Sequence, residues 1–114
     1  LCMSTPYVSA EYQASAAIVI ESLFDAHWWM GRTEPAWSAS FLRFYSSTFA
    51  RRYGRHFFDR ATCRRMPTIL HQFFDWLSET GLLPKRSRQA CKRLVTYWQD
   101  HNPFLRIQCE HLDE

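Results

Sequence analysis

The pattern of apolar and polar positions is most regular between Pro67 and Gly81. The apolar residues of this stretch recur at steps of one, three and four: Ile69, Leu70, Phe73, Phe74 and Leu77. This spacing gathers them on one side of a helix, with Gln72, Asp75 and Glu79 on the other. Pro67 suits a first helical turn, and Gly81 suits the left-handed residue after a last turn. We therefore predict a helix over 67–81, and we expect the rest of the chain to pack around it.

Two further helices are predicted before this one. Ser9 fits the N-cap of the first, which runs to about Met30. Pro35 fits the opening of the second, and Gly54 marks its end. The apolar stripe of the second helix follows the helical period and consists of Trp37, Phe41, Phe44, Tyr45, Thr48 and Phe49.

The pattern is less regular elsewhere. Between residues 56 and 66, Asp59 or Thr62 fits the cap of a short helix, and we expect a boundary, or else a kink, at Pro67. Ser87 fits the N-cap of a fourth main helix. The buried stripe of that helix is Cys91, Leu94, Val95 and Trp98. A last short helix or tucked tail is indicated by Phe104, Leu105 and Ile107.

These elements predict an all-α fold, a compact bundle of four main helices plus one or two short ones. The 114 residues suffice for a single domain over 1–114, with residues 1–8 and 110–114 frayed. Aromatic residues make up 17% of the chain, enough for a well-filled core. With only three Gly and five Pro, the chain lacks the many tight turns of a sandwich or barrel.

The cysteines give no sign of a metal site or a disulfide framework. Cys2, Cys63, Cys91 and Cys109 are widely spaced and form no CxxC pair, although two disulfides in three connectivities are arithmetically possible. Since no secretory signal is evident, we expect reduced, mostly buried thiols in a cytoplasmic protein. No apolar run approaches the roughly 18–20 residues that span a membrane.

Catalytic chemistry has equally weak signals. Cys63 lies among Arg60, Arg64 and Arg65, which would lower the pKa of an exposed thiol, but a buried inert thiol is the preferred interpretation. The pair Cys109-x-His111, with His101, is unlike the usual metal-binding patterns. Glycine-rich phosphate loops, GxSxG and HExxH are missing. We therefore expect no enzyme and no cofactor, and we nominate no catalytic or metal-binding residue.

Positive charge is concentrated in the middle of the chain. Residues 51–93 hold eleven Lys and Arg against three Asp and Glu, a net charge of +8 where the whole chain has +3. Lys85, Arg86 and Arg88 also oppose the macrodipole of a predicted helix start, which favours recruitment of an anion. The alternative is an ordinary solvated face over an aromatic core, and the pI near 8.8 is below the value above about 9 that is typical of nucleic-acid domains. The candidate nucleic-acid or anion-binding residues are Arg51, Arg52, Arg55, Arg64, Arg65, Lys85, Arg86, Arg88, Lys92 and Arg93.

One stretch is similar to a known family. The helix with Phe73-Phe74-x-Trp76-Leu77, ending at Gly81-Leu82-Leu83-Pro84, resembles the N-terminal helical DNA-clamping domain of tyrosine recombinases. The resemblance covers about 18 of the 114 residues, all of them core or capping types, and no catalytic half follows. It implies DNA contact only and assigns no family.

The leading functional hypothesis is a non-enzymatic module that binds a protein partner or a second copy of itself. The aromatic residues exceed what one small core encloses, and exposed rings form the anchors of interfaces. Trp28 and Trp29 are adjacent, so we expect one to cap the core and the other to seal a loop or lie at the surface. These two residues are the candidate partner-binding site, nucleic-acid binding is the alternative function, and no membrane or small-molecule partner is expected.

Overall fold

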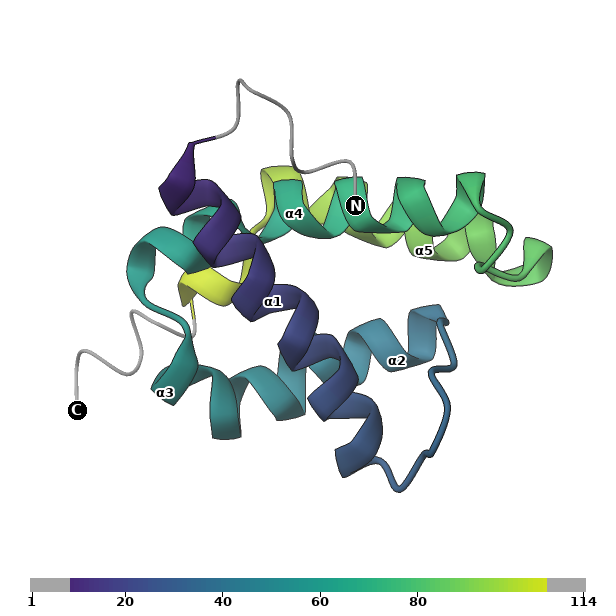
Figure 1. Cartoon of the computed structure of the whole chain (residues 1–114), viewed down its shortest axis with the longest axis horizontal. Coiled ribbons are helices and arrows are strands. Elements are labelled where there is room, and N and C mark those ends of the chain that lie inside the picture. Colours follow the sequence, from purple (N-terminus) through teal and green to yellow (C-terminus); the bar gives the residue numbers. More distant parts are fainter. Residues whose placement is uncertain (1–8, 107–114) are drawn as a thin grey trace.

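The computed structural model of the chain describes residues 9–106, with Arg55 described by its backbone alone. Within this range all regular secondary structure is helical, which confirms the predicted all-α bundle (Figure 1). A last helical turn covers residues 103–106, and the expected fraying at 1–8 and 110–114 lies outside the described residues. The helices are α1 (Ala10–Trp29), α2 (Ala39–Phe44), the π-helix η1 (Tyr45–Gly54), α3 (Arg55–Phe57), α4 (Arg60–Glu79) and α5 (Lys85–Asp100).

Helix α4 lies at the centre of the packing. It contacts α1 on one side and α5 on the other, and α5 also contacts α2. In Figure 1, α4 and α5 lie side by side, α1 crosses the molecule diagonally, and α2 continues into η1 in a separate row. Phe73 and Leu77 are only 2% and 1% exposed, so the helix expected to organise the fold does so.

Helix α4 continues through Pro67, so the expected boundary there is wrong. Asp59 begins the helix as one of the two predicted caps, with its Oδ1 accepting from the N–H of Thr62 at 2.7 Å. Pro67 has no N–H to donate to the carbonyl of Cys63. The side-chain amide of Asn102 donates to that carbonyl instead, at 2.9 Å. A distant residue therefore satisfies the acceptor that the proline leaves free.

The second helical segment begins later and winds differently than expected. It starts at Ala39 instead of Pro35, because Ser38 caps it by accepting from the N–H of Phe41 at 3.1 Å. From Tyr45 it becomes a π-helix, in which each N–H bonds five residues back. This winding leaves Thr48 exposed, although the regular helical period places it on the buried stripe.

Gly54 does not end that segment in a left-handed conformation, because its φ is −60° and the chain continues helically into α3. It is needed for close packing instead. A Cβ at this position would lie 2.8 Å from the ring of Phe58. Gly31 and Gly81, with φ of 76° and 77°, do end α1 and α4 in the left-handed region.

Helix α5 begins at Lys85, three residues earlier than a cap at Ser87 predicts. Pro84 occupies the N-cap position and offers no side-chain acceptor, so the expected cap at Ser87 is wrong. The inward stripe is as predicted for Cys91, Val95 and Trp98, while Leu94 is half-buried.

An aromatic cluster surrounds Trp37, in the loop between α1 and α2. Its indole makes edge contacts with the rings of Phe24 and Phe73, whose centroids are 5.6 and 5.3 Å away. His27 is buried beside it and stacks on Phe41 at 3.7 Å. This cluster joins α1, α2 and α4, and it lies beneath the outward surface of α1.

Candidate nucleic-acid interface and the apolar face of α1

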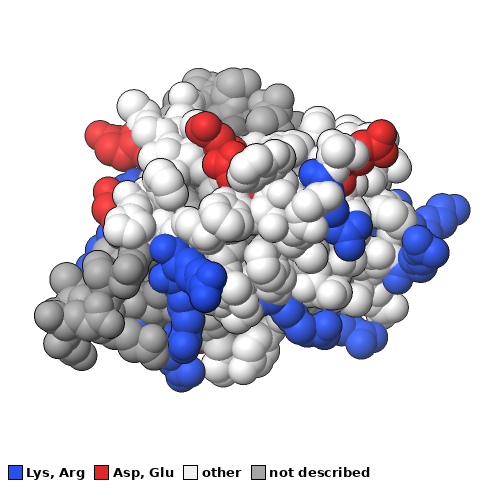
Figure 2. All heavy atoms as spheres, turned by 90° about the horizontal axis from the view of Figure 1, so that it is seen from below, with Lys and Arg blue, Asp and Glu red and all other residues white. Residues whose placement is uncertain are grey.

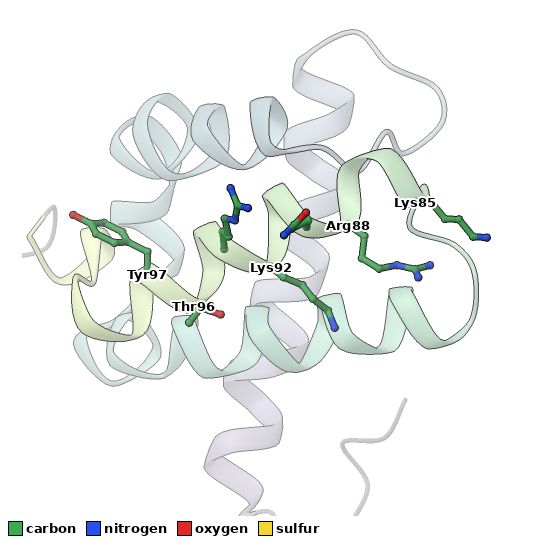
Figure 3. A pocket seen from close by; sticks show the side chains of 7 residues that line it. Lys85, Arg88, Lys92, Thr96 and Tyr97 are labelled. Atoms are coloured by element: carbon green, nitrogen blue, oxygen red, sulfur yellow. The ribbon is translucent and has the colours of Figure 1, made fainter.

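The outward side of α5 is rich in cations. Cys91, Val95 and Trp98 face the core, Ser87, Arg88, Lys92 and Leu94 are half-buried, and the remaining positions of the helix face solvent. An open hollow of about 660 Å³ is lined by four of the cations, all but Arg86, together with Gln89, Thr96 and Tyr97 (Figure 3). Five candidate cations lie on this surface, which we call the α5 cationic face: Lys85, Arg86, Arg88, Lys92 and Arg93.

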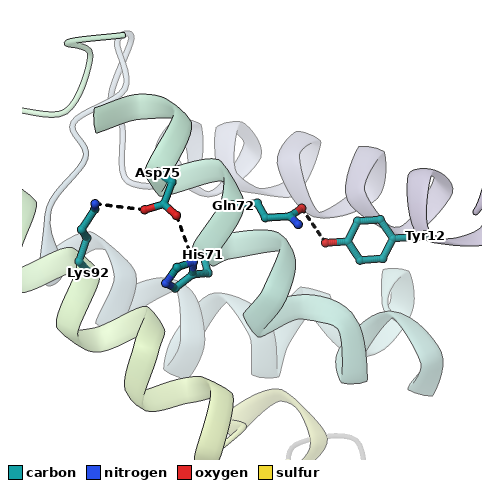
Figure 4. Close-up of polar contacts among 5 residues, drawn as sticks. All are labelled: Tyr12, His71, Gln72, Asp75 and Lys92. Atoms are coloured by element: carbon teal, nitrogen blue, oxygen red, sulfur yellow. Dashed lines mark hydrogen bonds and ion pairs between the residues drawn. The ribbon is translucent and has the colours of Figure 1, made fainter. Parts of the chain in front are cut away.

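Only some of these cations have polar contacts with other residues of the chain. Lys92 Nζ lies 3.1 Å from Asp75 Oδ1, and the other oxygen of Asp75 lies 3.3 Å from His71 Nδ1 (Figure 4). Arg88 donates to the carbonyl of Ser78 at 3.5 Å. The other three cations of the face, Lys85, Arg86 and Arg93, have no hydrogen bond or ion pair within the described part of the chain.

The start of α5 is electrostatically unfavourable by itself. Lys85, Arg86 and Arg88 lie within the first turn, where free N–H groups already carry partial positive charge. No acidic residue occupies this turn, and Pro84 provides no cap. Each cation costs roughly 0.3–1 kcal/mol there at low ionic strength. A bound anion would offset this repulsion.

The other five candidate cations lie on other elements. Arg51 and Arg52 line a separate hollow of about 480 Å³ with the serines of η1 and with Arg106. Arg64 is exposed on the first turns of α4. The predicted set of ten therefore falls into separate groups, and the side chain of Arg55 lies outside the description.

Arg65 has a structural role. Its guanidinium donates to Ser15 Oγ at 3.0 Å and to the carbonyl of Glu11 at 3.3 Å. These bonds tie α4 to α1, close to the buried contact between Ser15 and Thr62 hydroxyls at 3.1 Å. We therefore exclude Arg65 from the candidate interface.

The outward side of α1 exposes large apolar side chains beside the carboxylates of Glu21 and Asp25. Trp28 and Trp29 are 72% and 51% exposed, so the expectation that one of them caps the core is wrong. Trp29 packs on Tyr53 of η1 with ring centroids 4.4 Å apart. Trp28 stands one helical turn beyond Phe24, which is itself 46% exposed.

An apolar groove of about 360 Å³ lies next to these rings. Ile20 and Phe24 of α1 form one side, and Trp76 of α4 forms the other. Pro35 and Leu82 come from the two neighbouring loops. The sequence analysis did not predict this groove. One signal was present: apolar residues occur around most of α1, which is more than a helix with a single packed face needs.

The two signs of charge are unevenly distributed over the surface. In Figure 2 most of the carboxylates lie along the upper part of the visible face and most of the cations at its sides and lower part, although the two meet at the upper right. This separation agrees with the sequence, in which residues 1–50 carry a net charge of −2 and residues 51–93 carry +8.

The cysteines that the structure describes are free and buried. Burial raises the pKa of the Cys63 thiol to about 11, and the neighbouring Asp59 adds to the shift. Burial likewise raises the pKa of Cys91 to about 11. Neither thiol forms a thiolate readily at neutral pH. The pair Cys109 and His111 lies outside the described residues, and within residues 9–106 no three His, Cys, Asp or Glu side chains converge on a possible metal position.

The comparisons with known proteins assign no function to this chain. No protein-family model matches the chain, and no curated protein or solved structure matches it either. Within residues 9–106 no helix has the length and apolar character needed to cross a membrane. Function is therefore argued from the surfaces themselves.

Proposed function

We propose that the protein binds nucleic acid, and duplex DNA in particular, through the α5 cationic face. One observation carries the proposal: five cations lie on one helix, and three of them, Lys85, Arg86 and Arg93, are exposed and have no side-chain hydrogen bond or ion pair within the described residues. Clustered Lys and Arg along a helix are the electrostatic footprint of nucleic-acid binding.

The shape of the face favours B-form DNA over duplex RNA. The cations span residues 85–93, about 12 Å of helix at 1.5 Å per residue. A helix of this kind fits the major groove of B-DNA, whereas the major groove of A-form RNA is too deep and narrow for side chains to read. Arg93 and Gln89, which point outward among the cations, have the chemistry to contact guanine and adenine edges.

The test is binding of a fluorescently labelled duplex at about 50 and 200 mM salt. Each cation that neutralises a phosphate contributes about −0.9 to the slope of log K against log salt. A triple variant, Lys85→Gln, Arg86→Gln and Arg93→Gln, should therefore reduce the magnitude of the slope by up to about 2.7.

The matched control removes the same charge elsewhere, with Arg32→Gln, Arg43→Gln and Arg60→Gln. All three side chains are exposed and lie outside α5. The control should bind with nearly the slope of the original chain. Absence of binding to duplex DNA at low salt, or equal losses in the two triple variants, would reject the proposal.

A second function, binding of a protein partner, is favoured by the exposed indoles of Trp28 and Trp29. Rings of this size are typical anchors of protein interfaces. If the partner is a second copy, sedimentation should give a mass above 13.6 kDa that persists at high salt. The double variant Trp28→Ser and Trp29→Ser should then be monomeric.

A further inference from the structure

We infer that the apolar groove between α1 and α4 is a docking site for a cationic amphipathic helix of another protein. The inference develops the second proposed function by naming the chemistry of the partner, and it does not depend on nucleic-acid binding. It rests on two features, the apolar lining of the groove and the charge of the residues around it.

The lining is apolar on every side. Phe24, 46% exposed, and Leu82, 55% exposed, stand at its edges, and the indole of Trp37 lies between the two helices that form its walls. Trp28 extends the apolar surface along α1 by one turn. Contiguous apolar surface of this kind is costly in water and is typical of a docking groove for the apolar side of a helix.

Several residues next to the lining residues in the sequence are acidic. Asp75, beside Trp76, is paired with Lys92, and four others are unpaired within residues 9–106. Each of four carboxylates lies one or two positions from a residue of the groove: Glu21, Asp25, Glu34 and Glu79. All four are exposed, and none has an ion pair or hydrogen bond to its carboxylate within the described part of the chain. Among the cations, Lys92 reaches Asp75 beside Trp76, and Arg32 and Lys85 are each three positions in sequence from a lining residue.

Charge complementarity therefore selects the occupant. A helix with an apolar stripe at positions i, i+3, i+4 and i+7 fills the groove, and Lys or Arg along its edge reach Glu21 and Asp25 on α1. An acidic helix with the same stripe meets like charge at the same rim. The α5 cationic face of a second copy has the right charge, but its only large exposed hydrophobic residue is Tyr97, so a second copy fits less well.

The test uses two synthetic helical peptides of about 18 residues, long enough for a stripe of about 27 Å. They share one Leu stripe, and one carries Lys where the other carries Glu. Binding is measured by calorimetry with the full chain. The Lys peptide should bind with a stoichiometry of one, and the Glu peptide at least about tenfold more weakly.

Two variants connect binding to the groove. Phe24→Asp should abolish binding, while the matched control Phe57→Asp, 60% exposed on α3 and outside the groove, should leave it unchanged. The double variant Glu21→Lys and Asp25→Lys should reverse the preference between the peptides. Glu21, Asp25 and Phe57 are exposed, whereas Phe24 is 46% exposed and also packs on Trp37, so circular dichroism should first show that each variant keeps the helical spectrum of the original chain.

Several results would overturn the inference. Equal binding of both peptides removes the charge argument, and binding that survives Phe24→Asp places the site elsewhere. If neither peptide binds and sedimentation shows dimers that Phe24→Asp dissociates, the occupant is a second copy, and the partner function survives without this inference. If neither peptide binds and the chain is monomeric, this inference fails, and self-association fails with it.

Discussion

Helices α1 and α5 each pack one side against α4 and turn the other to solvent, and those two outer sides differ in chemistry. The outer side of α5 is cationic and polar, and water hydrates it well without a partner. The outer side of α1 presents Phe24, Trp28 and Trp29, whose exposure is unfavourable in water. The outer side of α5 therefore attracts anions over a distance, whereas the apolar residues on the outer side of α1 are stabilised only when another surface covers them.

The largest expected effect separates the buried and exposed tryptophans of the α1 region. Trp37→Ala should destabilise the protein by about 3–5 kcal/mol, because it empties the centre of the aromatic cluster. Trp28→Ala should change stability by less than about 0.5 kcal/mol, because its ring is largely exposed. Denaturant unfolding measures both. Similar losses in the two variants would mean that Trp28 is covered in solution.

The next largest loss of stability is expected at the contact between α4 and Asn102, which follows the end of α5. Asn102→Ala leaves the carbonyl of Cys63 without a donor, removes the acceptor for the N–H groups of Phe104 and Leu105, and should cost about 1–3 kcal/mol. Adding Pro67→Ala restores an N–H four residues after Cys63, so the double variant should recover part of the loss. Gln99→Ala, an exposed change on α5, serves as the control. If Pro67→Ala gives no recovery, the amide of Asn102 is not compensating for the proline.

The buried histidine of α1 should make stability depend on pH. Burial lowers the pKa of His27 below its ordinary value of 6.5, and the hydrogen bonds of its ring to the carbonyls of Leu23 and Ala36 only partly oppose this. The unfolded chain therefore takes up a proton first, and stability falls as pH drops below about 6.5.

Unfolding free energies at about pH 7.5 and 5.5 test this expectation. His27→Gln should flatten the decrease, and His101→Gln, an exposed change, should not. Asp59, whose pKa is lowered from 3.8 by hydrogen bonds from Thr62, contributes stability that is lost only at lower pH. Stability that is constant or higher at the lower pH would contradict the role of His27.

The smallest effect sharpens the electrostatics of α5. Asp75→Asn removes the carboxylate that pairs with Lys92, and a partly exposed pair contributes at most about 1 kcal/mol to stability. Freeing Lys92 should strengthen duplex binding by about two- to fivefold at constant salt. Glu79→Gln removes one negative charge from α4 without breaking an ion pair. An equal gain in that variant would show that only net charge matters.

The sequence was sufficient for the elements whose signals are local. The cap at Ser9, whose Oγ accepts from the N–H of Tyr12 at 3.1 Å, follows from local sequence. So do the inward stripe of α5 and the amphipathic helix through Phe73 and Leu77. The cationic composition of residues 51–93 was equally plain. The sequence did not show that these cations lie on separate surfaces, because it does not specify how the helices are arranged in space.

The failures have physical reasons that lie at a distance. Pro67 predicts a helix boundary from local sequence alone. The helix continues because Asn102, 35 positions later in the sequence, donates the hydrogen bond that the carbonyl of Cys63 would otherwise lack. The regular α-helical period predicts that Thr48 is buried, but this part of the chain is a π-helix with a different period. The groove beside Phe24 requires two loops and two helices to meet, and no local pattern contains that information.

The most direct test of the two-surface account is amide chemical-shift mapping on one labelled sample, titrated separately with duplex DNA and with the Lys peptide. The account predicts that DNA shifts amides of α5 between residues 85 and 97, and that the peptide shifts amides around Ile20, Phe24 and Trp76. The two sets should not overlap. Shifts by DNA centred on Arg51 and Arg52, or both ligands shifting one common surface, would contradict it.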